Sequence, residues 1–133
     1  MTPAFSGLDA GDEKFVSLTT FRRNGEPVPT TVWIARDGDA LVVTTPSGSG
    51  KVKRLRRDPR VELRPSTRFG KVDDDAPVVR GTAQVLDDAA SEQRVGEVVG
   101  AKYGLEYKAV MGVEGLASSG SRERVMLRIT PDA

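Results

Sequence analysis

The residues best suited to chemistry lie in a loop rich in Gly, Ser and Thr at positions 44–51 (TTPSGSGK) and in the basic run that follows it. Six of the ten residues at 51–60 are Lys or Arg. Small residues let backbone N–H groups approach an oxyanion, and the start of a helix adds partial positive charge. Lys51 and Arg54, at i and i+3, share one side of the first helical turn. The segment therefore predicts a site for an anion such as phosphate.

Two other interpretations of this segment stay open. A basic run on a short helix also forms an ordinary solvated face. A nucleic-acid-binding barrel would use the same charges, but it would interleave aromatic residues for stacking, and none lies between Trp33 and Phe69. The segment is not a P-loop, because that motif requires Gly where Thr45 stands and Ser or Thr where Val52 stands. We expect no nucleic-acid partner.

Composition removes several classes of enzyme. The 133 residues include neither Cys nor His, so thiolate nucleophiles, Ser-His-Asp triads and zinc sites of the Cys/His type are excluded. The aspartates at 73–75 lack EF-hand spacing and are typical of a solvated loop, so we expect no metal. Because no acid, base or nucleophile is recognisable, we assign no catalytic residue. An enzyme with this sequence needs a cofactor to carry the reactive atom.

Net charge, apolar run length and the N-terminal sequence bear on where in the cell the protein is located. The formal net charge is +1, and no apolar run approaches the ~20 residues of a membrane span. The first residues lack the basic-then-apolar layout of a signal peptide. We expect a cytoplasmic protein without membrane contact.

The hydrophobic pattern predicts the elements that position the anion-binding loop. Six strands are expected at residues 14–21, 28–36, 40–45, 60–64, 78–86 and 125–129. Helices are expected at 51–57, with Ser49 as N-cap, and at 89–103, before Gly104; residues 105–111 are compatible with a further turn. Loops are expected at 67–77 and 115–121, and Trp33 is expected to cover the barrel. This order fits a mainly β, closed or partly open barrel in one domain, 1–133.

Several stretches also resemble a known family. They are residues 15–45 (FVSLTTFRRNGEPVPTTVWIARDGDALVVTT), residues 50–61 (GKVKRLRRDPRV) and residues 81–83 (GTA). They resemble the flavin split-barrel proteins related to pyridoxamine-phosphate oxidase, and within these the actinobacterial PPOX-class F420-dependent oxidoreductases. The excess of 14 Arg over 6 Lys suits a GC-rich genome. The resemblance implies a six-stranded antiparallel split β-barrel with short helices that forms a homodimer, with the cofactor at the subunit interface.

The resemblance also implies a function and a site. The implied cofactor is the deazaflavin F420, with FMN as the alternative, and the implied reaction is hydride transfer between reduced F420 and a small unsaturated or electrophilic substrate. A cofactor carrier without turnover is a further alternative. The implied contacts are Thr44, Thr45, Ser49, Lys51 and Arg54 with the cofactor phosphate and anionic tail, Pro29, Thr30 and Thr31 along the ring, and, near the site from the partner subunit, Ala76 and Pro77.

Overall fold

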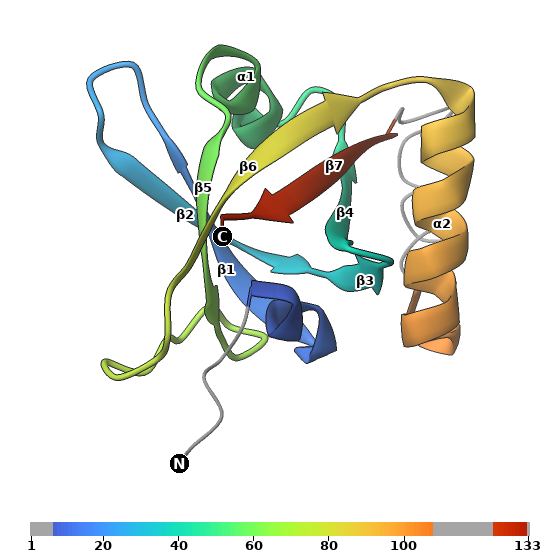
Figure 1. The fold of residues 1–133 in the computed structure, drawn as a ribbon, viewed down its shortest axis with the longest axis horizontal. Coiled ribbons are helices and arrows are strands. Elements are labelled where there is room, and N and C mark those ends of the chain that lie inside the picture. The colour runs from blue at the N-terminus through green and yellow to red at the C-terminus, as the bar shows by residue number, and fades with distance from the viewer. Residues whose placement is uncertain (1–6, 108–123, 133) are drawn as a thin grey trace.

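A seven-stranded antiparallel sheet curls into a half-barrel in the computed structural model, which describes residues 7–107 and 124–132 (Figure 1). The strands are β1 (Phe15–Phe21), β2 (Pro27–Trp33), β3 (Ala35–Asp37), β4 (Ala40–Pro46), β5 (Arg60–Pro65), β6 (Val79–Leu86) and β7 (Arg124–Pro131). The helices are a 3-10 helix η1 (Gly7–Asp12), α1 (Gly50–Arg57) and α2 (Ala89–Tyr103). The mainly β fold expected from the sequence is therefore confirmed.

The prediction of six strands is wrong, because the expected second strand divides at Ile34. Its first part, β2, pairs with β1, and its second part, β3, pairs with β4. Between them, the Ile34 N–H donates to the Tyr103 hydroxyl at 3.0 Å, and the Ile34 carbonyl accepts from Lys102 Nζ at 2.7 Å. The backbone of Ile34 is thus bonded to side chains of α2. The apolar alternation runs unbroken through Ile34, so it cannot show this change of partner.

The order of strands explains why the barrel is split. It runs β2-β1-β5-β6-β7-β4-β3, so the two outermost strands are consecutive in the chain and joined by Ile34 alone. β3 pairs only with residues 40–42 of β4. The second half of β4, residues 43–46, is paired with β7 on one side only. Its other side faces the open edge of β2. The sheet is therefore joined at Ile34 and open beside it.

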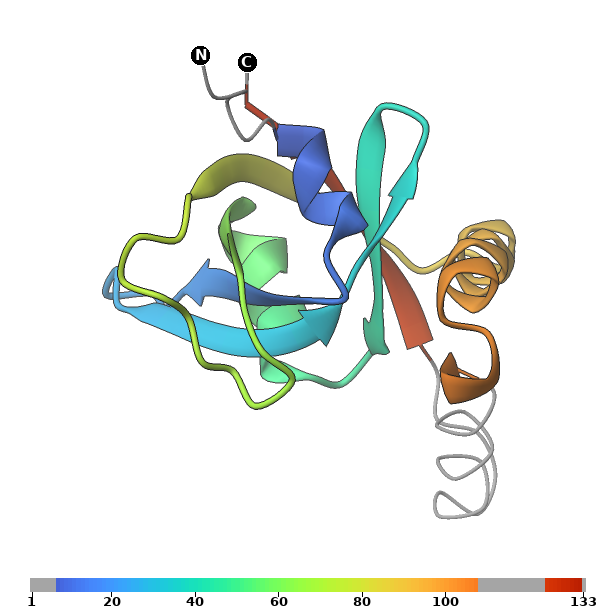
Figure 2. The same cartoon turned by 90° about the horizontal axis from the view of Figure 1, so that it is seen from below.

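Two apolar clusters stabilise this arrangement. The inner core fills the barrel and includes Leu18, Leu63 and Leu127, all at most 1% exposed. The outer core lies between the sheet and α2 and includes Val42, Met126 and Val99. Successive residues of β4 point alternately into the inner and the outer core. Because both faces of the strand are buried, its apolar run at 40–43 is continuous. Figure 2 shows α2 outside the curled sheet.

Short helices close the two ends of the inner core. α1 contributes Val52 and Leu55, and η1 contributes Ala10, all at most 3% exposed. Figure 1 shows these helices at opposite ends of the barrel. α1 and α2 match the expected helices. η1 is not expected from the sequence, because its polar segment contains only two apolar residues and no clear helical pattern. Residues 105–107 are helical, and 108–111 and 115–121 lie outside the described residues. No helix in the described part of the chain has the length and apolar character to cross a membrane.

Candidate functional site

The split in the barrel opens into a cavity of about 300 Å³ between β2 and β4, which we call the barrel cleft. Its walls come from both strands, from the start of β1, from α1, from the β5–β6 loop and from the start of β7. The lining residues are Thr31, Val32 and Trp33 on β2, Thr44, Thr45 and Pro46 on β4, and Phe15, Lys51, Arg68 and Arg124. Segments distant in sequence thus converge on one opening.

Three cations, Lys51, Arg68 and Arg124, line the barrel cleft, and no acidic residue is among the lining residues that the structure describes. Arg124 is held on β4, where its Nε donates to Thr44 Oγ1 at 3.0 Å and its guanidinium also donates to the Thr44 carbonyl at 3.1 Å. Burial lowers the pKa of Lys51, and the charges of Arg54 and Arg124 lower it further. An anion in the cleft would offset both the burial and the mutual repulsion of these cations.

The start of α1 adds donors to this end of the cleft. Ser49 occupies the N-cap position, as expected, but its side chain makes no capping hydrogen bond. Its hydroxyl instead lies 3.4 Å from the Thr45 hydroxyl. The Ser49 side chain therefore leaves the first-turn N–H groups of α1 to other acceptors, and such groups favour anions.

The open edge of β2 supplies backbone groups along the opposite wall. The β1–β2 ladder starts with the Arg22 N–H donating to the Glu26 carbonyl at 2.9 Å. In an antiparallel ladder every second residue then directs its N–H and C=O away from its partner strand, which here selects Pro27, Pro29, Thr31 and Trp33. The prolines have no N–H, so the donors on this edge are concentrated at Thr31 and Trp33, beside the cleft.

Trp33 is fixed against α2. Its ring stacks on Tyr103 with a centroid separation of 4.6 Å and an interplanar angle of 9°. Tyr103 is 7% exposed; its hydroxyl accepts from the Ile34 N–H and lies 2.7 Å from the carbonyl oxygens of Ile34 and Lys14. Burial raises the pKa of Tyr103 to about 12. Trp33 therefore packs between the sheet and α2, against the outer core, and also forms a wall of the cleft.

The β5–β6 loop brings Arg68 to the cleft. The Thr67 hydroxyl accepts from the N–H groups of Phe69 and Lys71, which fixes a tight turn. In this turn Gly70 has φ +84° and lies so close to β2 that an added Cβ would be 2.8 Å from Thr31 Oγ1. Only a residue without a side chain fits this approach, so Gly70 seats the loop beside Thr31.

The loop segment that contains the three aspartates is bound to Arg64 through backbone carbonyl groups. Arg64 donates to the carbonyl oxygens of Asp73, Asp74 and Ala76 at 2.9 to 3.3 Å. Among the described residues no group of three or more potential metal ligands is close enough to hold an ion.

The site residues expected from the sequence fall into separate places. Thr31, Thr44, Thr45 and Lys51 line the barrel cleft together. The others are distributed as follows: Ser49 beside Thr45, Pro29 exposed further along β2, Thr30 turned toward the Leu18 carbonyl, Arg54 in a different cavity next to α1, and Ala76 and Pro77 in the β5–β6 loop.

Sequence reasoning missed Phe15, Arg68 and Arg124 as cleft residues. Arg124 is opposite Pro46 in the β4–β7 register, 78 positions away in the chain. Hydrophobic periodicity gives the face of a strand but not the register between distant strands, so it contains no signal for this pair. Arg68 depends on the turn at Thr67, which the composition of the loop marks only as a loop.

Comparison with known proteins agrees with the fold. The model of the pyridoxamine 5'-phosphate oxidase family matches residues 8–133. A solved structure described as an F420 reductase superposes with a TM-score of 0.62 at 19% identity, covering 99% of this chain and 97% of that one. A conserved hypothetical protein from Mycobacterium tuberculosis gives 0.69 at 26% identity, covering 100% and 82%.

Other solved structures with this fold have different descriptions. HutZ, described as a heme storage protein from Vibrio cholerae, superposes with a TM-score of 0.68 at 12% identity, covering 93% of this chain and 85% of that one. No curated protein gives a significant match to the sequence. The family model covers nearly the whole chain, and the fold agrees with it. The chain belongs to the pyridoxamine 5'-phosphate oxidase family.

Proposed function

We propose that this protein is an oxidoreductase that binds F420 in the barrel cleft and transfers a hydride between reduced F420 and a small unsaturated or electrophilic substrate. The observation that carries the proposal is the cleft itself, where the described lining residues include three cations, one of them a partly desolvated lysine, and no carboxylate. Family membership and the similarity to a protein described as an F420 reductase support it.

The residues present fit a cofactor with a phosphate and a polar ring edge. Lys51 and Arg124 would bind the phosphate, together with the hydroxyls of Thr45 and Ser49 and the first-turn N–H groups of α1. The backbone edge at Thr31 and Trp33 would bind the hydrogen-bonding edge of the ring. When bound, the deazaflavin supplies the carbon that gives or accepts hydride. The protein binds and orients it, and the Trp33 wall excludes water.

We also propose that a second copy of the chain completes the site. A cavity of about 300 Å³ is at the small end of ligand pockets, and a tricyclic ring with a phosphate chain extends beyond it. In a homodimer the site would lie at the interface, near Ala76 and Pro77 of the partner subunit. Neither residue is aromatic, so Trp33 and Phe15, which both line the cleft, would supply the aromatic surface of the pocket.

FMN is the second candidate cofactor. The cleft offers cations for a phosphate and backbone groups for a ring edge, and both features are common to the two cofactors. A carrier that holds F420 without turnover is the other alternative.

Turnover separates an enzyme from a carrier. Reduced F420 would be mixed with the protein and a panel of small enones and nitro compounds, and its oxidation followed by absorbance. We expect oxidation that depends on acceptor and is lost in Lys51→Ala. Tight binding of F420 with no oxidation by any acceptor would support the carrier instead.

A further inference from the structure

A second cavity, of about 440 Å³, lies between the β1–β2 hairpin and α1. We call it the hairpin pocket. The hairpin contributes Arg22, Arg23 and Asn24, and α1 contributes Lys53, Arg54 and Arg57. Five of these six side chains are cationic, none is acidic, and the pocket shares no lining residue with the barrel cleft.

Two of the five cations are fixed by neutral partners. Arg54 Nε donates to Thr20 Oγ1 at 2.7 Å, and Arg57 donates to the Phe21 carbonyl at 2.9 Å. The side chains of Arg22, Arg23 and Lys53 make no hydrogen bond or ion pair with any other residue that the structure describes. The pocket thus has a fixed wall of two guanidinium groups and three further cations at its margin.

The cations just outside the pocket are arranged differently. Arg56 lies 3.5 Å from Asp87, and Arg60 lies 2.7 Å from Asp58. Carboxylates therefore pair with cations on the outer side of this basic region. None of the five pocket cations forms an ion pair with a carboxylate in the described part of the chain, although Asp58 attracts Arg57 over a longer distance. Inside it, burial and the charges of Arg22 and Arg57 lower the pKa of Arg54. Like charges held this close disfavour the folded state unless an anion joins them.

We propose that the hairpin pocket binds a multivalent oxyanion independently of any ligand in the barrel cleft. Guanidinium groups bind paired oxygens of phosphates and carboxylates through two parallel hydrogen bonds. The two fixed guanidiniums would hold one anionic group, and Arg22, Arg23 and Lys53 would close on a second. A ligand with two or more charged groups uses this pocket better than a monovalent ion.

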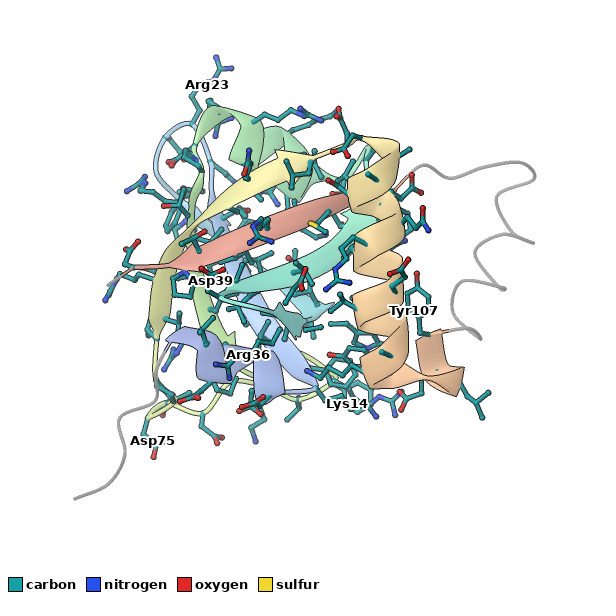
Figure 3. All side chains as sticks on the ribbon, turned by 45° about the vertical axis from the view of Figure 1, so that its right-hand side comes forward. Lys14, Arg23, Arg36, Asp39, Asp75 and Tyr107 are labelled. Carbon is teal, nitrogen blue, oxygen red and sulfur yellow. The ribbon has the colours of Figure 1, made fainter. Side chains whose placement is uncertain are left out.

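Calorimetric titration of the full chain tests this proposal, with inorganic pyrophosphate in one arm and citrate in the other, at about 0.15 M salt. Arg22→Gln and Lys53→Gln should each weaken binding about tenfold. The control Arg36→Gln removes one charge elsewhere, at the far end of the molecule from Arg23 in Figure 3, and should bind like the wild type. Lys51→Gln reports separately any binding of the same anion in the barrel cleft.

Comparing the pyrophosphate and citrate titrations identifies the chemical class of the bound anion. Tighter binding of pyrophosphate assigns a phosphate chain, and tighter binding of citrate assigns an oligocarboxylate. Because Arg22→Gln and Lys53→Gln relieve repulsion, their Tm without anion should equal or exceed that of the wild type, which separates lost binding from lost folding. Binding of neither anion would overturn the proposal. So would equal weakening in Arg36→Gln, or weakening in Lys51→Gln with none in the pocket variants.

Discussion

Lys51 is the residue whose environment most directly reflects the proposed function. It is half-buried in a cleft whose described lining holds two arginines and no carboxylate. Replacing it with alanine removes a charge-assisted hydrogen bond to the cofactor phosphate, which contributes about 1.5 to 3 kcal/mol. We expect the Kd for F420 to rise roughly 10- to 150-fold in Lys51→Ala, as measured by fluorescence titration.

Lys53→Ala is the matched control for this change, because it removes a lysine from the exposed side of the same helix. It should leave the affinity close to that of the wild type. Equal weakening in both variants would assign the effect to the general charge of α1, and the cleft would lose its assigned role.

The lowered pKa of Lys51 makes cofactor binding depend on pH. Burial, Arg54 and Arg124 all favour the neutral amine, so Lys51 loses its proton at a lower pH than an ordinary lysine. A bound phosphate favours the charged form. We therefore expect the affinity to fall as the pH rises through the lowered pKa, and to fall much less in Lys51→Arg, whose guanidinium stays charged. Identical pH profiles for the two proteins would contradict this.

Tyr103 connects stability to pH in the alkaline range. Its pKa of about 12 in the fold exceeds the ordinary value of 10.0, so the unfolded chain deprotonates first. Stability should fall between pH 10 and 12 by about 1.4 kcal/mol per pH unit from this group. Tyr103→Phe should lose this component, and at neutral pH it should lose about 1 to 3 kcal/mol through the unsatisfied backbone of Ile34. Urea unfolding of the wild type and Tyr103→Phe, at neutral pH and between pH 10 and 12, measures both changes in the free energy of unfolding.

At the scale of elements, β6 packs closely against the backbone of β7 at Gly81. A Cβ at Gly81 would lie 2.7 Å from the Thr130 carbonyl oxygen and 3.2 Å from Pro131 Cα, so the backbone of β7 would have to shift. We expect Gly81→Ala to destabilise the fold by about 1 to 3 kcal/mol. Gly48→Ala is the control, because nothing lies within 4 Å of its added Cβ. Urea midpoints that are the same for both variants would refute this packing.

Elements with a local signal could be predicted from the sequence. α2 has helical periodicity, a capping aspartate that accepts from Ser91 N–H, and Gly104 after its end, and its predicted bounds agree with the structure. The strands agree to within two residues except at Ile34. There the sequence keeps its alternation while the hydrogen-bond partner changes from β1 to α2, and that choice depends on tertiary contacts of Lys102 and Tyr103.

The candidate cleft could be predicted only in part, mainly where its residues lie close together in the sequence. Thr44, Thr45 and Lys51 lie on one continuous segment, and the structure keeps them together. Arg54 is one helical turn from Lys51, yet its bond to Thr20 draws it into the hairpin pocket. Arg68 and Arg124 enter the cleft through a turn and a strand register that composition does not encode.

At the scale of the whole molecule, we expect a homodimer. If a second copy completes the cleft, oligomeric state and cofactor binding are linked, and each stabilises the other. Sedimentation equilibrium should show a dimer whose dissociation constant decreases when F420 is added, and Tm should rise with protein concentration. A monomer that binds F420 with full affinity, with a Tm independent of concentration, would contradict the shared site.

The most direct test of the central claim is a parallel fluorescence titration of the purified protein with F420 and with FMN. The proposed function predicts saturable binding of F420 at micromolar concentration and weaker binding of FMN. It also predicts F420 binding that is roughly 10- to 150-fold weaker in Lys51→Ala and unchanged in Lys53→Ala. Stronger binding of FMN would assign the same cleft to a flavin. Binding of neither cofactor at tens of micromolar would contradict the account, and the basic residues around the cleft would then form a solvated surface.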